Sequence, residues 1–190
     1  METSELRQEV AAARTLFKEM KYSEAFIGFL KLHSKGNITA SSYLGYMYEH
    51  GLGMAVDKDE ALRIYREASD RGSERAQLMC ASLLRSMSEY AESTRLYAKL
   101  SENGNPSAKY WMYICFRDGL GYTKDMQQSD AYLKQAAEAG HLYAMRDLSK
   151  QYLRGEHGFI GIFKGIAMSF SAIARSANAL ANDPDGDKLH

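Results

Sequence analysis

The residues of this 190-residue chain that could do chemistry are few and far apart in the sequence. The five histidines are His33, His50, His141, His157 and His190. The chain has no His-Glu-x-x-His pair, no phosphate-binding Gly-x-x-x-x-Gly-Lys loop and no Gly-x-Ser-x-Gly turn. His50 and His157 fall at turns and could meet in space as metal ligands, but solvated turn histidines are the simpler interpretation. The pattern argues against an enzyme, and we expect no cofactor and no metal.

The two cysteines, Cys80 and Cys115, favour buried thiols. Each stands at an apolar position of a helix-like segment, and free cysteine is among the most buried residue types. Two cysteines are also too few for a disulfide-rich secreted scaffold. Because the chain has neither a basic, apolar leader nor an uncharged apolar run of 18 residues, we expect a soluble protein of the reducing cytoplasm.

The composition is that of an ordinary globular protein, with 45% hydrophobic and 25% charged residues. Lysine and arginine together number 24, and so do aspartate and glutamate, which gives a formal net charge of zero. A neutral chain carries no general attraction for nucleic acid. Only an uneven distribution of these charges could create a binding surface.

Columns of similar residues recur along the chain with steps of 36, 32 and 36 residues. A glycine ends each helix-like run, and an alanine opens the next run four positions later. The glycine column is Gly36, Gly72, Gly104 and Gly140, and the alanine column is Ala40, Ala76, Ala108 and Ala144. Apolar residues at spacings of three and four predict two amphipathic helices in each repeat. Since one helical pair cannot bury its apolar stripe alone, the pairs must stack.

The unit that opens at Ala40 reads Ala40-x-x-x-Leu44-Gly45-x-x-Tyr48-x-x-Gly51-x-Gly53, followed by Asp57, Ala61, Ala68 and Gly72. This pattern resembles the Sel-one-like repeat family, a relative of the tetratricopeptide solenoids. The resemblance implies an all-α, right-handed solenoid of about five helix-turn-helix repeats with an extended C-terminal capping helix. We predict one repeat domain over residues 1–181, with units at 6–36, 38–73, 74–105, 106–141 and 142–181, and a polar tail over 182–190.

Residues 159–181 carry only two charges, Lys164 and Arg175. Their apolar stripe is Phe159, Ile162 or Phe163, Ile166, Phe170, Ile173, Ala177 and Leu180, and opposite it lie Gly161, Lys164, Gly165, Ser169, Ser171 and Ser176. We expect the second helix of the last unit, lengthened into a cap that covers the end of the solenoid. Docking to a partner or to a second copy is one alternative, and peripheral association with a membrane surface is the other.

The resemblance also implies that the first helices of the units line a concave surface. Counted from each alanine of the column, and with the first unit placed by its 68-residue offset, the inward positions carry nine basic residues and two acidic ones. The predicted binding groove consists of Arg14, Phe17, Tyr46, His50, Arg75, Arg85, Tyr110, Arg117, Tyr143, Arg146, Lys150 and Arg154. Arginine offers paired donors to a carboxylate or phosphate, and the rings add flat contact area. A merely solvated charged face is the alternative.

These features predict a non-catalytic adaptor or scaffold that binds an acidic peptide or partner surface in the groove. Known roles of the family suggest a setting in bacterial cell-envelope or polysaccharide assembly, by analogy alone. Direct binding of an anionic polysaccharide or a lipid head group is the second hypothesis. Nucleic acid ranks last because the chain is neutral.

Overall fold

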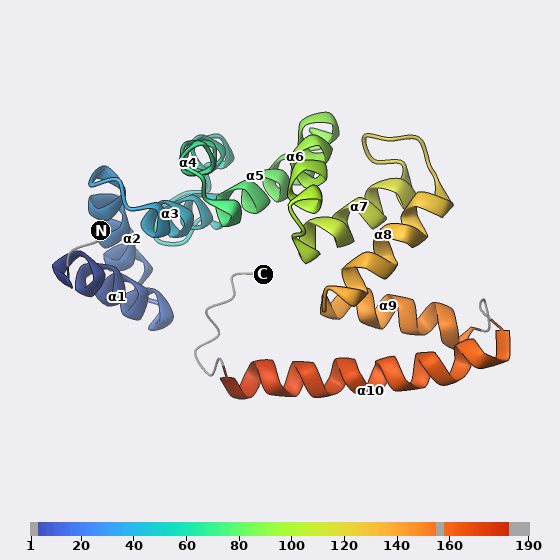
Figure 1. Ribbon diagram of the computed structural model, residues 1–190. Helices are drawn as coiled ribbons and strands as arrows, with labels where there is room; N and C mark the ends of the chain where they lie inside the picture. Colours follow the sequence, from blue (N-terminus) through green and yellow to red (C-terminus); the bar gives the residue numbers. More distant parts are fainter. Residues whose placement is uncertain (1–3, 155–157, 183–190) are drawn as a thin grey trace. The chain divides into compact units, whose positions relative to one another are not determined.

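The computed structural model describes residues 4–154 and 158–182, and within them the backbone forms ten α-helices and no strand (Figure 1). In chain order the helices are α1 (Ser4–Lys18), α2 (Tyr22–Ser34), α3 (Ile38–His50), α4 (Lys58–Asp70), α5 (Glu74–Ser86), α6 (Tyr90–Glu102), α7 (Pro106–Asp118), α8 (Met126–Glu138), α9 (Leu142–Leu153) and α10 (Gly158–Asn182). The prediction of an all-α solenoid of helix-turn-helix repeats is confirmed.

The chain divides into two compact units, Met1–Leu96 and Tyr97–His190, and the boundary lies inside α6. In the first unit, each helix from α1 to α5 packs on its neighbour in the sequence. In the second unit, α7 packs on α8, α8 on α9, and α9 on α10. The repeat boundaries and the single domain remain predictions. His157, His190 and residues 183–190 of the expected polar tail lie outside the described residues.

One residue at each repeat junction ends a helix and starts the next. These junction residues are Asn37, Ser73, Asn105 and His141. Each donates its backbone N–H to the carbonyl five residues earlier, at 3.0 or 3.1 Å, and the glycine before it has a φ between 77° and 91°. Each side chain then accepts the backbone N–H of the column alanine, at 2.8 to 3.3 Å. The glycine and alanine columns therefore have a local cause, helix termination and helix capping.

Small residues let neighbouring helices approach closely in the core. All four alanines of the column are fully buried. On α3, Gly45 lies against the buried ring of Tyr65 from α4, and an added Cβ would be 2.4 Å from Cε1 of that ring. The Tyr65 hydroxyl donates to Oε2 of Glu49 at 3.0 Å, and burial together with this carboxylate raises the pKa of Tyr65.

The expectation of buried thiols is confirmed for both cysteines, which are buried and form no disulfide with each other. Burial raises the pKa of the Cys80 thiol to about 11, because a thiolate is poorly solvated among apolar side chains. The thiol of Cys80 is therefore neutral and unreactive in the folded chain.

Helix α10 packs along α9 (Figure 1). Gly161 and Gly165 are buried, and Ser169 Oγ lies 3.1 Å from Ser149 Oγ. An added Cβ at Gly165 would lie 2.9 Å from Cβ of Tyr152 on α9. The glycines therefore allow a closer approach than larger side chains would permit.

Four residues of the apolar stripe lie on the side of α10 away from the α9 contact. Phe163, Ile166, Phe170 and Ile173 are 62%, 43%, 70% and 66% exposed. The close contact of Gly165 with Tyr152 places α9 on the side of α10 opposite these four residues. Among the helices that the structure describes, none combines the length and the apolar character needed to span a bilayer.

His141 differs from the other junction residues because its capping atom can take up a proton. Its Nδ1 accepts the backbone N–H of Ala144 at 3.3 Å, and its ring stacks on Tyr110 with centroids 4.5 Å apart. Burial lowers the pKa of His141 to about 4, while the Asp147 carboxylate acts in the opposite direction. The neutral imidazole is thus the capping form, since a protonated Nδ1 can no longer accept a hydrogen bond.

Replacing Gly45 by alanine should destabilise the first unit. At an exposed helical site the change would stabilise the helix by roughly 0.5–1 kcal/mol. Here the added methyl group would overlap the Tyr65 ring, and overpacking costs roughly 1–3 kcal/mol. We expect a lower melting temperature by circular dichroism, with a smaller loss for Gly28→Ala, whose Cβ would lie 3.2 Å from Cβ of Ala13. An unchanged or raised melting temperature for Gly45→Ala would contradict the close packing.

The stability of the chain should fall as the pH drops from about 6.5 to about 4 because of His141. In this window the unfolded state has bound the proton and the folded state has not, so the proton favours unfolding. Above and below the window the contribution is constant. A His141→Asn variant keeps a capping side chain that does not titrate, and its melting temperature should lose this part of the pH dependence. Parallel pH profiles for wild type and variant would show the prediction to be wrong.

Candidate functional site

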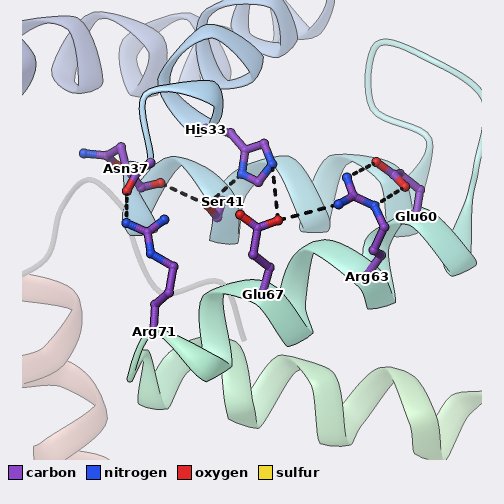
Figure 2. Close-up of polar contacts among 8 residues, drawn as sticks. His33, Asn37, Ser41, Glu60, Arg63, Glu67 and Arg71 are labelled. Atoms are coloured by element: carbon purple, nitrogen blue, oxygen red, sulfur yellow. Dashed lines mark hydrogen bonds and ion pairs between the residues drawn. The ribbon is translucent and has the colours of Figure 1, made fainter.

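A serine, a histidine and a glutamate of the first unit lie in the order of a hydrolase triad (Figure 2). Nδ1 of His33 is 2.9 Å from Oγ of Ser41, and Nε2 is 3.9 Å from Oε2 of Glu67. The Ser41 hydroxyl donates to the carbonyl of Asn37 at 3.0 Å, so its oxygen accepts the imidazole N–H. This direction is opposite to that of a nucleophile and its base. Ser41 is also buried. The three side chains therefore form a polar contact that joins α2, α3 and α4.

The same polar cluster continues along α4 (Figure 2). Arg63 donates to the two carboxylate oxygens of Glu60 at 2.7 and 2.8 Å, and this bond holds the pKa of Glu60 below its usual range. Arg63 also lies 3.5 Å from Glu67, and Arg71 donates to the carbonyl of Gly36. All of these contacts run within the chain. The cluster therefore joins α2, the α2–α3 junction, α3 and α4 by side-chain contacts.

On the first helices of the first unit, three predicted groove residues lie together. The ring centroids of Phe17 and Tyr46 are 6.2 Å apart, and those of Tyr46 and His50 are 4.1 Å apart. The Nδ1–H of His50 donates to the Tyr46 carbonyl at 3.0 Å. Phe17 also packs edge-on against the buried ring of Tyr43. Phe17 is thus half-buried against the core, whereas His50 is exposed beside the half-buried Tyr46.

Arg75 lies at a shallow pocket where α3 and α5 begin. The pocket has a volume of about 180 Å³ and is lined by Ile38, Thr39, Ser42, Tyr43, Ser73 and Arg75. The guanidinium carbon of Arg75 is 5.9 Å from the centre of the Tyr43 ring, a cation–π contact. Over the described residues, the structure gives Arg75 no ion pair with a carboxylate. Its charge is therefore open to a ligand in the pocket.

Two helix N-termini meet at this pocket and add to its positive potential. The caps are Asn37 of α3 and Ser73 of α5. A second pocket of about 220 Å³, lined by Leu6 and residues 35–39, shares Ile38 and Thr39 with the first. Its cation, Lys35, is already 2.6 Å from Glu9, and this contact lowers the pKa of Glu9.

In the second unit, aromatic residues of α7 and α9 form a shelf around Asp147. The Tyr110 hydroxyl donates to Oδ2 of Asp147 at 2.8 Å, and burial followed by this bond raises the pKa of Tyr110. The Tyr110 ring stacks on Tyr143 with centroids 6.3 Å apart. Because Tyr143 is 53% exposed, the shelf offers an aromatic surface to a partner.

The cations of the same face are paired within the chain. Arg117 donates through Nε and Nη2 to the two oxygens of Asp118, both at 2.7 Å. Arg146 donates to Asp147 at 3.1 Å, and Nζ of Lys150 lies 3.7 Å from the same carboxylate. Hydrogen bonds to the carboxylates raise the pKa of Arg117 and Arg146. The basic surplus of this face is therefore smaller than the count from the inward positions.

The remaining predicted groove residues are Arg14 and Arg85, which are half-buried, and Arg154, which is exposed directly after α9.

Sequence reasoning missed Asp147 and Tyr43. The sequence does contain a signal for an ion pair at Asp147, because Asp147 directly follows Arg146 and lies three positions before Lys150 on a helix. In the part of the chain that the structure describes, no three histidine, cysteine or acidic side chains gather as metal ligands.

Residues 38–73 and 106–141 each match the Sel1 repeat. A Sel1 repeat protein from Oxalobacter formigenes superposes with a TM-score of 0.70 at 24% identity, over 87% of this chain and 69% of that one. An immunity protein from Pseudomonas aeruginosa superposes with a TM-score of 0.63 at 19% identity, over 93% of this chain and 69% of that one. At these identities the structural likeness shows the fold alone.

Each matched range contains one helical pair, α3 with α4 in the first range and α7 with α8 in the second. Sel1 repeat proteins generally act as protein-interaction scaffolds. The resemblance inferred from the columns of glycine and alanine is confirmed: this chain is a helical-repeat protein that carries Sel1 repeats at residues 38–73 and 106–141.

Proposed function

We propose that this chain is a non-catalytic adaptor that binds an acidic peptide, or the acidic surface of a partner protein, on the first helices of its first unit. The observation that carries the proposal is Arg75, which lies over Tyr43 at a pocket and is not engaged by a carboxylate among the described residues. The scaffold role of related repeat proteins supports the class of function.

A carboxylate suits this pocket better than a larger ligand does. Small-molecule sites commonly have volumes of roughly 300–1,000 Å³, whereas this pocket has about 180 Å³. The guanidinium fork matches the two oxygens of a carboxylate, and the hydroxyls of Thr39 and Ser42 line the same space. Further along α3, Tyr46 and His50 supply surface for neighbouring peptide side chains. Arg14, Phe17 and Arg85 complete the proposed face.

The face of α7 and α9 in the second unit contributes to partner binding in a different way. Its residues are Tyr110, Arg117, Tyr143, Arg146, Lys150 and Arg154. Because Asp118 and Asp147 already engage most of these cations, a ligand anion would have to replace an existing ion pair. Contact with the aromatic shelf should therefore contribute more than charge.

An anionic polysaccharide or a lipid head group presents the same anionic chemistry and is the second candidate. A glycan would depend on the tyrosine rings as much as on the arginines. The proposed setting is the cytoplasm, with peripheral association at a membrane and a role in cell-envelope or polysaccharide assembly. This setting rests on family analogy.

An Arg75→Glu variant should lose binding to an acidic peptide. The probe is a fluorescent, glutamate-rich peptide with a free C-terminal carboxylate, measured by anisotropy at low salt. Loss of a charged hydrogen bond of roughly 1.5–3 kcal/mol corresponds to roughly 10–100-fold weaker binding. The fold should persist, because Arg75 is exposed in the first turn of α5, where a glutamate interacts favourably with the helix dipole.

The matched control is Arg95→Glu, an exposed residue of α6 whose replacement changes the net charge equally. An equal loss of peptide affinity in both variants would mean that only net charge matters. An unchanged affinity in Arg75→Glu would refute the pocket as the binding site. Uronic-acid oligosaccharides and vesicles with anionic lipid, used in place of the peptide, decide between the two candidates.

A further inference from the structure

The exposed stripe of α10 follows a strict heptad. Its residues Phe163, Ile166, Phe170 and Ile173 are spaced by three, four and three, and the sequence continues the same series at Phe159, Ala177 and Leu180. With Phe163 as position a, every member falls at a or d. A sustained 3.5-residue period is typical of a helix that pairs with another helix, whereas an isolated surface helix needs no such period.

The two faces of α10 are chemically separate. Gly165 and Ala172 occupy c positions and Met168 an f position, and all three lie on the side of α9. At 100° per residue the c and f positions lie nearly opposite the a and d positions. The residues that pack on α9 are therefore different from those of the stripe. Phe163, Ile166, Phe170 and Ile173, here called the α10 seam, are exposed on the other side of the helix.

We propose that the α10 seam is a self-association surface, and that its occupant is the α10 seam of a second copy of this chain. The positions beside a seam normally choose the partner by charge. Between Phe163 and Ala177 the e positions are Ala167 and Ala174 and the g positions are Ser169 and Ser176, all uncharged. Two copies therefore meet without like-charge repulsion along the seam. Small flanking residues also let two helices approach closely.

The balance of charge favours the same occupant over a membrane. The chain has a formal net charge of zero, so copies do not repel one another as whole molecules. A helix that lies on an anionic membrane carries many basic residues on its polar face. Among residues 159–181, only Lys164 at a b position and Arg175 at an f position are charged.

The exposed area indicates a weak dimer. With roughly 200 Å² for a large side chain, the observed exposures leave roughly 450 Å² of apolar side chain on each copy. Two copies together approach the lower limit of specific interfaces, about 1,200 Å², once the flanking residues are included. We therefore expect a dissociation constant on the order of 10 µM.

Sedimentation velocity of the full chain from about 1 to 200 µM brackets this affinity. Wild type should pass from monomer to dimer over this range. Phe170→Asp combined with Ile173→Asp should remain monomeric with unchanged helicity. The matched control combines Ile27→Asp and Leu30→Asp on α2, which are also exposed at 68% and 43%, and it should dimerise like wild type. A second pair, Phe170→Gln with Ile173→Gln, removes the apolar surface without added charge and guards against loss of folding.

Three results would overturn the proposal: a wild type that stays monomeric up to the highest concentration, a dimer that persists in both seam variants, or a dimer lost equally in the α2 control. A monomer that instead sediments with phosphatidylglycerol vesicles, and loses this with the seam variants, would assign the seam to a membrane surface and also overturn a second copy as its occupant.

Discussion

A single residue at each repeat junction ends one helix and starts the next, and the rest of the fold depends on this. The backbone N–H of Asn37, Ser73 or Asn105 closes the preceding helix, while the side chain caps the following one. No linker fits between two helices joined in this way. The second helix of one pair must therefore pack against the first helix of the next, and the column alanine in the first turn is fully buried at that contact.

The same packing rule explains where apolar surface remains. Helix α4 is covered by α3 and α5, and α8 is covered by α7 and α9, so their apolar residues such as Leu62 and Leu133 are buried. Their solvated sides are polar, as Arg63 of α4 shows. In the second unit α10 packs on α9, and its other side is apolar instead of charged.

The sequence could predict features that depend on interactions between residues close in the chain, but not features that depend on contacts between distant residues. The glycine and alanine columns could be predicted because helix ends and caps are local. The side of α10 that packs on α9 could not be predicted, because both of its faces suit a helical neighbour. Gly165 decided it, because its backbone lies so near Tyr152 that any side chain would clash. For the candidate site, the sequence could place residues on a face, but the pairing of Arg117 with Asp118 depends on side-chain conformations that no spacing determines.

The charge that a ligand meets differs from the charge counted over a face. A carboxylate that approaches Arg117 must displace Asp118 from two hydrogen bonds of 2.7 Å, so the exchange gains little. At Arg75 the described neighbours offer a tyrosine ring and hydroxyls but no bound carboxylate, so a ligand adds bonds without breaking an ion pair. Specificity for an anion therefore depends on which cation lacks an internal acid, and for this reason the proposed recognition site lies in the first unit although both units carry similar numbers of predicted groove residues.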